Sequence, residues 1–281
     1  MDVGPFRDLV TVLLGVLTGL LSGLFGVGGG VVSQPGMRAL GMEPLLVIGT
    51  ALPVIIPGAA SGARRFAREG YIRWPAVVAT VPAGILAAIV GGLVADRVPG
   101  DGHLLQLITA GLLGFSAWRM GRAPVPLPLD EPRAETDAVE APDPDDAPKP
   151  GAENRSTDGL LGRYASIGLL AGGLSGLLGI GGGVILVPAF VRLARMEVKA
   201  AIATSLVCVG SFAIPGTITH GLLDDIDWRV AAALVVGVVP GARVGAALTV
   251  RLADGRLRVT VATFLGITAV VYAATELSSL L

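Results

Sequence analysis

The sequence contains the same glycine-rich phrase twice. Residues 21–34 read LSGLFGVGGGVVSQ, and residues 174–187 read LSGLLGIGGGVILV. The similarity continues downstream at an offset of 153 or 154 positions, in pairs that include Pro35 with Pro188, Thr50 with Thr204 and Trp74 with Trp228. Because self-similarity at a fixed spacing indicates a duplicated structural unit, the chain is expected to fold as two related halves.

Each half is apolar enough to span a membrane. Hydrophobic residues make up 52% of the 281 residues and charged residues only 15%, with a mean hydropathy of +0.73, which is far more apolar than a soluble domain. Since about twenty apolar residues cross a bilayer as a helix, the chain is predicted to be an all-α integral membrane protein with about five apolar helical segments in each half. These segments are 6–26, 28–42, 44–63, 74–95 and 103–120, followed by 159–180, 182–194, 198–219, 229–250 and 257–277.

A polar segment separates the halves. Residues 121–158 hold eight of the 19 prolines and ten of the 22 acidic residues. Such a composition buries too little apolar surface to fold by itself, so this segment is predicted to be a disordered linker. The predicted organisation is a first membrane repeat at 1–120, the linker at 121–158 and a second membrane repeat at 159–281.

Charge indicates how the two halves are oriented. The loop after segment 44–63, ARRFAREGYIRW, contains four arginines, whereas the equivalent loop of the second half, HGLLDDIDWR, contains three aspartates. The positive-inside rule places these loops on opposite sides of a membrane, with the arginine loop and the linker in the cytoplasm and both chain termini outside. Each half then crosses an odd number of times, whether its first two segments cross separately or dip in and return as a hairpin. The result is a pair of inverted repeats, which is a transporter architecture; the alternative is a duplicated membrane scaffold without transport activity.

Each glycine phrase leads into a segment that is too short to cross a bilayer comfortably. Segments 28–42 and 182–194 also contain a proline each, so both are expected to be broken or re-entrant helices. Glycines at the start of such a helix expose backbone N–H groups, and the helix dipole adds partial positive charge, so an anion can bind there. The candidate substrate-binding residues are therefore Gly28, Gly29, Gly30, Gly181, Gly182 and Gly183. The alternative is that these glycines only form a tight turn and allow close helix packing.

Four polar residues near the phrases are further candidates for substrate binding. Gln34 follows the first phrase where the second has Val187, so a site there would be asymmetric. Thr50, Thr204 and Ser205 lie one to two turns into the third segment of each half and offer hydroxyl groups. The alternative is that these hydroxyls bond to backbone carbonyls of their own helix, as Ser and Thr commonly do in membrane helices.

Two ionisable residues in the apolar segments have alternative interpretations. Arg243 is the only charge well inside such a segment, and intramembrane charges are functional candidates by default. It lies opposite a stripe of Gly237, Gly241 and Gly245, so it either faces a cavity and attracts an anion or extends to the cytoplasmic headgroups. His220 lies beside the aspartate loop, where it is either a proton-linked residue or an ordinary residue of the wet interface.

Several activities lack the residues that they require. The string GVGGGV departs from the dinucleotide-binding fingerprint, because Val31 replaces the third glycine and membrane segments flank the motif. The sequence has one cysteine, Cys208, and two well-separated histidines, so no metal-ligand spacing is visible. No nucleophile, base and orienting residue occur together, so we expect neither an enzyme nor a cofactor, and nothing indicates a nucleic-acid partner.

The sequence resembles a family of membrane transporters. The phrases LSGLFGVGGGVVSQPGM and LSGLLGIGGGVILVPAF, the segments GTALPV and ATSLVC, and HGLLDDIDWRVAAALVVGVVPGARVGAAL are similar to the sulfite exporter TauE/SafE family, also called the 4-toluene sulfonate uptake permease group. The resemblance covers nearly the whole chain except the linker, whose length departs from the short central loops expected in this family. It implies a multi-pass plasma-membrane transporter of small sulfur-containing anions such as sulfite or organosulfonates.

The resemblance leaves two classes of function open. The first is a secondary transporter, expected to be an exporter, with uptake of organosulfonates or of another small carboxylate anion as the alternative. Its driving force is expected to be protons or the membrane potential, because the sequence contains no P-loop. The second class is a non-transporting membrane scaffold. The expected partners are the small anionic substrate, the lipid bilayer and coupling protons, and the sequence does not indicate an oligomeric state.

Overall fold

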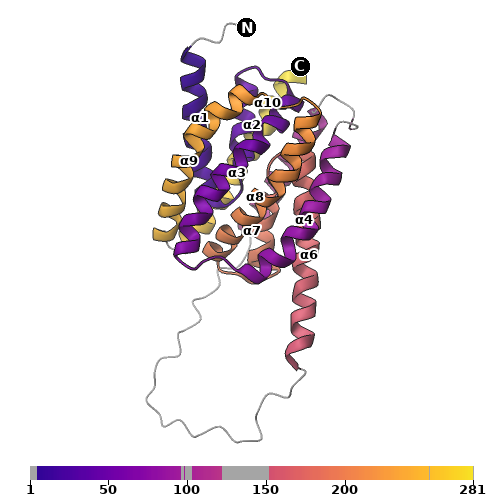
Figure 1. The fold of residues 1–281 in the computed structure, drawn as a ribbon. Helices are drawn as coiled ribbons and strands as arrows, with labels where there is room; N and C mark the ends of the chain where they lie inside the picture. Colours follow the sequence, from indigo (N-terminus) through magenta and orange to yellow (C-terminus); the bar gives the residue numbers. More distant parts are fainter. Residues whose placement is uncertain (1–4, 96–97, 99–102, 122–151, 253, 281) are drawn as a thin grey trace, which may run out of the picture.

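A computed structural model describes residues 5–95, 98, 103–121, 152–252 and 254–280 (Figure 1). Over these residues the regular structure is entirely helical, which confirms the predicted all-α fold. The helices are α1 (Pro5–Phe25), α2 (Gly30–Ala39), α3 (Pro44–Arg68), α4 (Trp74–Ala95), α5 (His103–Gly121), α6 (Ala152–Leu178), α7 (Gly183–Arg192), α8 (Val198–Leu222), α9 (Trp228–Arg251) and α10 (Asp254–Leu280). Among the described residues, six helices are long and apolar enough to cross a membrane, namely α1, α3, α4, α8, α9 and α10.

The helix bounds differ most from the predicted segments at α6. This helix begins at Ala152, so its first turns overlap the end of the region 121–158 that the composition assigns to the linker. Figure 1 shows these turns extending below the other helices. All eight prolines of the predicted linker precede Ala152, and because proline removes a helical hydrogen bond, the helix begins only where the prolines end. Residues 122–151, which make up most of the predicted linker, lie outside the described residues.

The two glycine phrases interrupt the helices where the sequence predicts a break. α1 ends at Phe25 and α2 begins at Gly30, while α6 ends at Leu178 and α7 begins at Gly183. The half-helices α2 and α7 have ten residues each. At about 1.5 Å per residue, each is about 15 Å long, or about half the hydrocarbon thickness of a bilayer.

Each half-helix folds back beside the helix that precedes it. Arg7, near the start of α1, donates to the carbonyl of Leu40, just after α2, at 3.4 Å. Tyr164 of α6 and Phe190 of α7 pack edge to face with ring centroids 6.1 Å apart. In Figure 1 the α1–α2 hairpin enters the bundle from the top and the α6–α7 hairpin enters from the bottom. Of the two arrangements that the sequence left open, the structure has the hairpin.

The helices pair in the same way when the two halves are exchanged. α1 packs against α9 as α6 packs against α4, while α3 pairs with α8 and α5 pairs with α10. The predicted glycine stripe of α9 lies against α1, since a Cβ atom at Gly237, Gly241 or Gly245 would come 2.1–2.3 Å from a backbone oxygen of α1. A Cβ atom at Gly176 of α6 would come 2.0 Å from the Ala88 carbonyl oxygen of α4. Small residues thus bring the helix backbones into contact, as is common in membranes.

Equivalent helices of the two halves run in opposite directions in the bundle. Figure 1 shows α1 running downward and α6 running upward. Inverted repeats require this relation, and the orientation of each half in a membrane stays a prediction.

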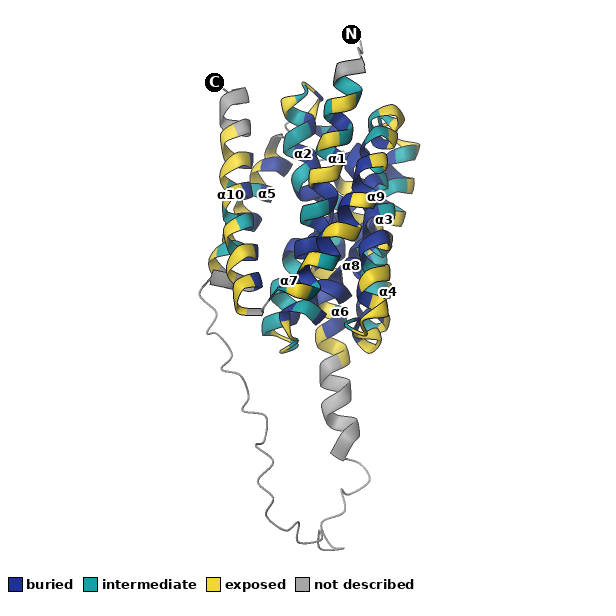
Figure 2. Ribbon diagram, turned by 90° about the vertical axis from the view of Figure 1, so that its left-hand side faces the viewer, coloured by how far each residue is buried: buried dark blue, intermediate teal, exposed yellow. Residues whose placement is uncertain are grey.

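Apolar side chains are exposed on the outer surface. Figure 2 shows exposed residues along the outward faces of α1, α4 and α10. Val78 and Leu86 on α4 and Val236 and Val244 on α9 are all more than half exposed. Soluble proteins rarely expose large apolar areas, whereas the hydrocarbon core of a bilayer covers them.

Candidate substrate site

The two glycine phrases meet inside the bundle. A Cβ atom at Gly30 would lie 2.4 Å from the carbonyl oxygen of Gly179, in the break of the other half. In the reciprocal contact, a Cβ atom at Gly183 would lie 2.5 Å from the carbonyl oxygen of Gly26. The N-terminus of each half-helix therefore abuts the break of the opposite half, and a side chain at either position would push the two apart.

The breaks use backbone conformations that favour glycine. Gly28 and Gly181 have φ angles of +81° and +83°, in the left-handed region. The second break has a further left-handed residue, Gly182 at +70°, whereas its equivalent Gly29 has a φ angle of −67°. The two breaks are equivalent in position but not in conformation, so the space between them is asymmetric.

Backbone N–H groups at both breaks have no acceptor in the described part of the chain. The first N–H group to donate in α2 belongs to Val32, and in α7 to Ile185. The N–H groups of residues 29–31 and 182–184 donate no hydrogen bond among the described residues, and all these residues are buried. Buried N–H groups are nearly always paired in proteins, and at helix N-termini they commonly bind anions. Both halves thus offer donors to a small anion where the phrases meet.

Two β-branched side chains cover this meeting point. Val209 of α8 lies against both breaks, because a Cβ atom at Gly28 or at Gly181 would come 2.8 Å from its Cγ1 atom. Ile55 of α3, which is equivalent to Val209, lies 3.2 Å from the Cβ position of Gly181. Both side chains are at most 1% exposed. The described conformation is therefore closed, and an anion can reach the N–H groups only if these side chains or their helices move.

Gln34 bridges the two halves in a buried polar network. Its Nε2 atom donates at 2.8 Å to the carbonyl of Leu178, the last residue of α6, and so holds the second break in place. Its Oε1 atom accepts from the Tyr272 hydroxyl of α10 at 3.0 Å. Both side chains are fully buried. Sequence reasoning selected Gln34 but missed Tyr272, because no local signal indicates that α10 lies beside α2.

Two hydroxyl side chains lie beside the first break. The predicted candidate Ser205 donates to the carbonyl of Gly26 at 2.7 Å. Thr18 of α1, which the sequence analysis missed, lies with its methyl group 3.1 Å from the Cβ position of Gly29. Its buried Oγ1 atom has no partner among the described residues. The sequence does carry one signal for Thr18, because the equivalent residue in the second half is Ala171, which has no hydroxyl group.

The two predicted threonines hold loops of the opposite half. Thr50 accepts a hydrogen bond from the backbone N–H of Asp227 at 2.9 Å. Thr204 accepts one from the backbone N–H of Arg73 at 3.1 Å. These contacts are equivalent under exchange of the halves, and both side chains are fully buried. Each threonine therefore anchors the loop that leads into α9 or α4.

Arg243 lies apart from the other candidates. It is exposed on the side of α9 that faces away from the glycine stripe. This position matches the alternative in which the side chain extends along the apolar surface toward the headgroups. The predicted candidates that the structure brings together are Gly28, Gly29, Gly30, Gly181, Gly182, Gly183, Gln34 and Ser205.

A separate apolar pocket of about 290 Å³ lies between α5, α6 and α7. Its walls include Leu112, Phe115, Leu174 and Pro188, and none of the predicted substrate-binding residues lines it. Among the described residues, no group of three His, Cys, Asp or Glu side chains is arranged to hold a metal ion. Neither feature therefore adds to the site between the glycine breaks.

The chain is similar to membrane transporters over nearly its whole length. The family model described as "Sulfite exporter TauE/SafE" matches residues 11–272. A "Probable membrane transporter protein" of Xylella fastidiosa (strain Temecula1) is 29% identical over 251 residues, which cover 88% of this chain and 87% of that protein. The "Probable membrane transporter protein MamO" of Paramagnetospirillum magneticum is 31% identical, over 86% of this chain and 40% of MamO. The "Probable membrane transporter protein YunE" of Bacillus subtilis is 26% identical, over 85% of this chain and 88% of YunE. No solved structure matches the chain. Since the family match includes both glycine phrases and overlaps all six long apolar helices, this chain is a multi-pass membrane protein that belongs to the sulfite exporter TauE/SafE family of membrane transporters.

Proposed function

We propose that this protein is a secondary transporter that exports small sulfur-containing anions, such as sulfite or organosulfonates, across the plasma membrane. The observation that supports this most is the contact between the two glycine breaks. There, the buried N–H groups of residues 29–31 and 182–184 have no acceptor within the described residues.

The chemistry of the site suits a compact anion. Sulfite and sulfonate groups carry several negative oxygens on one sulfur atom, and hydrogen bonds from N–H groups to charged oxygens are short and strong. The dipoles of α2 and α7 both place partial positive charge at the site. Glycine lets an oxygen approach the backbone closely, while Val209 and Ile55 limit the space available. The site therefore favours small anions over bulky ones.

The arrangement of the hairpins supports an alternating mechanism. The α1–α2 hairpin and the α6–α7 hairpin reach the glycine contact from opposite ends of the bundle (Figure 1). Movement of one half against the other would open the contact first to one side and then to the other. No covalent step is needed, so the protein is proposed to be a transporter and not an enzyme.

We further propose the orientation that the charged loops favour. The end of α3 and the loop that follows it carry four exposed arginines, namely Arg64, Arg65, Arg68 and Arg73. Positive loops remain in the cytoplasm. With this loop inside, the start of α1 and the end of α10 lie outside.

Flux measurements on purified protein in liposomes test the proposal. We expect saturable flux of labelled sulfite or sulfoacetate in vesicles loaded with the same unlabelled anion, and none in protein-free vesicles. Arg243→Ala is the matched control, because Arg243 lies apart from the glycine breaks and its removal leaves the site intact. Absence of flux for a panel of sulfite, sulfoacetate, acetate and chloride would overturn the transporter proposal. Faster flux of acetate than of either sulfur anion would overturn the assigned substrate class.

A further inference from the structure

A buried histidine and a partly buried aspartate form a pair at one end of the bundle. His220 lies in the last turn of α8 and is fully buried, and its Nδ1 atom is 3.1 Å from Oδ2 of Asp225, in the turn between α8 and α9. This turn packs closely on α3, since a Cβ atom at Gly49 would come 2.2 Å from the Asp225 carbonyl oxygen. His220 is therefore not an exposed residue of the wet interface, because the turn and α3 enclose it.

The other half has an aromatic pair at the equivalent positions. His220 corresponds to Phe66 and Asp225 corresponds to Tyr71 at the offset that relates the two halves. Phe66 is fully buried, and the two rings pack edge to face with centroids 6.5 Å apart. An apolar pair thus meets the packing requirement of this position. The ionisable pair in the second half points to a role beyond packing.

His220 lies on the face of α8 that leads to the glycine breaks. It is about three helical turns, or about 16 Å, from Val209, so the two side chains share one face of the helix. Between them on this face lie Ala213 and Gly216, which are small and buried. A Cβ atom at Gly216 would lie 3.1 Å from Leu52 of α3. His220 therefore stands at the end of the α3–α8 contact that has to open before an anion reaches the breaks from this side.

The pair can take up a proton at a defined atom. An ionised carboxylate only accepts hydrogen bonds, so with Asp225 ionised the proton of neutral His220 is on Nδ1. The other ring nitrogen, Nε2, is buried and has no partner among the described residues. A proton added to the Nε2 lone pair produces an imidazolium that remains paired with Asp225. It also changes Nε2 from an acceptor into a donor, which an anion can use.

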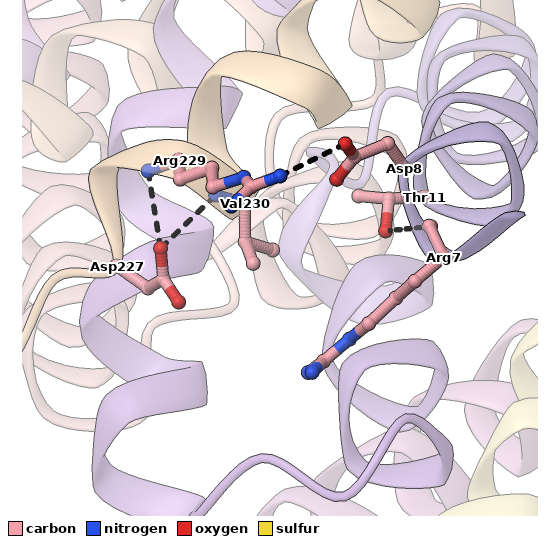
Figure 3. A network of polar contacts seen from close by, with 6 residues as sticks. All are labelled: Arg7, Asp8, Thr11, Asp227, Arg229 and Val230. Carbon is pink, nitrogen blue, oxygen red and sulfur yellow. Dashed lines mark hydrogen bonds and ion pairs between the residues drawn. The ribbon is translucent and has the colours of Figure 1, made fainter. Parts of the chain in front are cut away.

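Most other ionisable groups at this end reach the surface or are already bonded. Figure 3 shows Arg229 of α9 reaching the Asp8 carboxylate of α1 at 3.1 Å, and both side chains are at least 44% exposed. Asp227 accepts the N–H groups of the first turn of α9 (Figure 3). The sequence of α4 contains no ionisable residue, and neither do residues 44–63 of α3 nor residues 165–178 of α6. Arg7 and Arg38 bond to the carbonyls of Leu40 and Met42. Glu43 and Asp224 are exposed, and Tyr272 bonds to Gln34. Of the residue types at this end of the bundle, histidine is the one that commonly exchanges a proton near neutral pH.

We propose that His220, held by Asp225, binds the proton that is coupled to anion movement. A proton from the solution adds to Nε2 when this end of the bundle is open, and the resulting N–H donates to the anion on its way between this end and the glycine breaks. When the bundle opens on the opposite side, the proton leaves Nε2 into the solution there together with the anion, so one proton crosses the membrane with each anion. This inference rests on the proposed transport function and names the coupling ion and its site.

The test replaces the pair with the one that the first half already has. The double variant His220→Phe/Asp225→Tyr copies the Phe66–Tyr71 packing, so it is expected to fold. A second variant, His220→Gln, keeps an amide N–H that can donate to Asp225 but takes up no proton. Each is reconstituted in liposomes with the panel anion that exchanges fastest in the wild type. Two rates are measured: exchange without any gradient, and net flux driven by an imposed pH gradient.

We expect both variants to keep gradient-free exchange while the stimulation by the pH gradient falls by at least about fivefold, the lower end of typical coupling between linked sites. Wild-type stimulation that persists in both variants would overturn the inference. If the wild type exchanges anions but an imposed pH gradient does not change its net flux, the inference would be overturned and the proposed transport function would stand. If both variants lose gradient-free exchange as well as the stimulation by the pH gradient, the pair is purely structural, and this result would also overturn the inference. Absence of exchange for every anion in the wild type would overturn the transport function itself.

Discussion

Replacing Gly181 by alanine tests whether the glycine breaks require close contact as well as glycine's backbone freedom. The matched control is Gly41→Ala. Both glycines have a φ angle of +83°, but a Cβ atom at Gly41 would meet nothing within 4 Å. At Gly181 the same atom would come 2.8 Å from Val209 Cγ1 and 3.2 Å from Ile55 Cδ1. The two substitutions therefore share the backbone strain and differ in crowding.

The expected cost follows from these two contributions. A left-handed alanine costs about 1–2 kcal/mol, which is the whole effect at Gly41. Overpacking in a close-packed core adds about 1–3 kcal/mol at Gly181. Val209 cannot easily give way, because the same methyl group also lies 2.8 Å from the Cβ position of Gly28. Gly181→Ala should therefore destabilise the protein by roughly 2–5 kcal/mol, the sum of the two ranges.

The assay is thermal unfolding in detergent, together with anion exchange in liposomes. With roughly 2–4 °C per kcal/mol for a chain of this order of size, Gly181→Ala should melt several degrees below Gly41→Ala. Exchange should persist in the Gly41 variant and be largely lost in the Gly181 variant. Equal melting temperatures and equal exchange rates would refute the reasoning, because they would show that crowding by Val209 and Ile55 has no consequence.

Three further predictions, one of them with Arg243→Ala as its control, separate the site from its surroundings. Gly182→Leu should abolish anion exchange while Arg243→Ala leaves most of it, because only Gly182 lies in the glycine contact. Normal exchange in the Gly182 variant would show that the glycines serve helix packing and not anion binding. Ser205→Ala removes the hydrogen bond to the Gly26 carbonyl, so it should lower the free energy of unfolding by about 0.5–1.5 kcal/mol, the usual net value of one hydrogen bond. Chemical denaturation measures this change, and an unchanged denaturation midpoint would contradict it. Thr50→Val keeps the shape but leaves a loop N–H without its acceptor, so a loss of about 1–3 kcal/mol is expected, and a melting temperature equal to that of the wild type would exclude it.

The helical segments and the breaks could be predicted because they depend on local composition. Apolar runs of bilayer length need no partner to be recognised, and the triple glycines are unfavourable in any helix, so the ends of α1 and α6 followed from the sequence. The small-residue stripe of α9 was equally visible, because its spacing alone indicates a packing face. The start of α6 at Ala152 was missed, because the composition of the whole segment 121–158 was averaged across the point where the prolines stop.

The site was predicted only in part, because its contacts join residues far apart in the chain. Glycines, Gln34 and Ser205 were selected from their neighbours in sequence, and the structure brings them together. Val209 and Tyr272 carry no local signal, since a valine and a tyrosine in an apolar helix are ordinary until another helix is placed against them. For the same reason the sequence left two interpretations of His220 open, because the burial that excludes an exposed interface residue depends on a turn that packs on α3.

The sequence by itself determined that this protein is a duplicated helical membrane protein whose two halves break at the same glycine phrase. Those properties follow from hydropathy, from repetition and from the conformational preference of glycine, all of which act over a few neighbouring residues. Only the tertiary structure decided that Gly30 abuts Gly179 while Gly183 abuts Gly26, and that Val209 covers the contact. Helices in a bilayer have little hydrophobic reason to choose one neighbour over another, so close fit between small surfaces decides which faces meet.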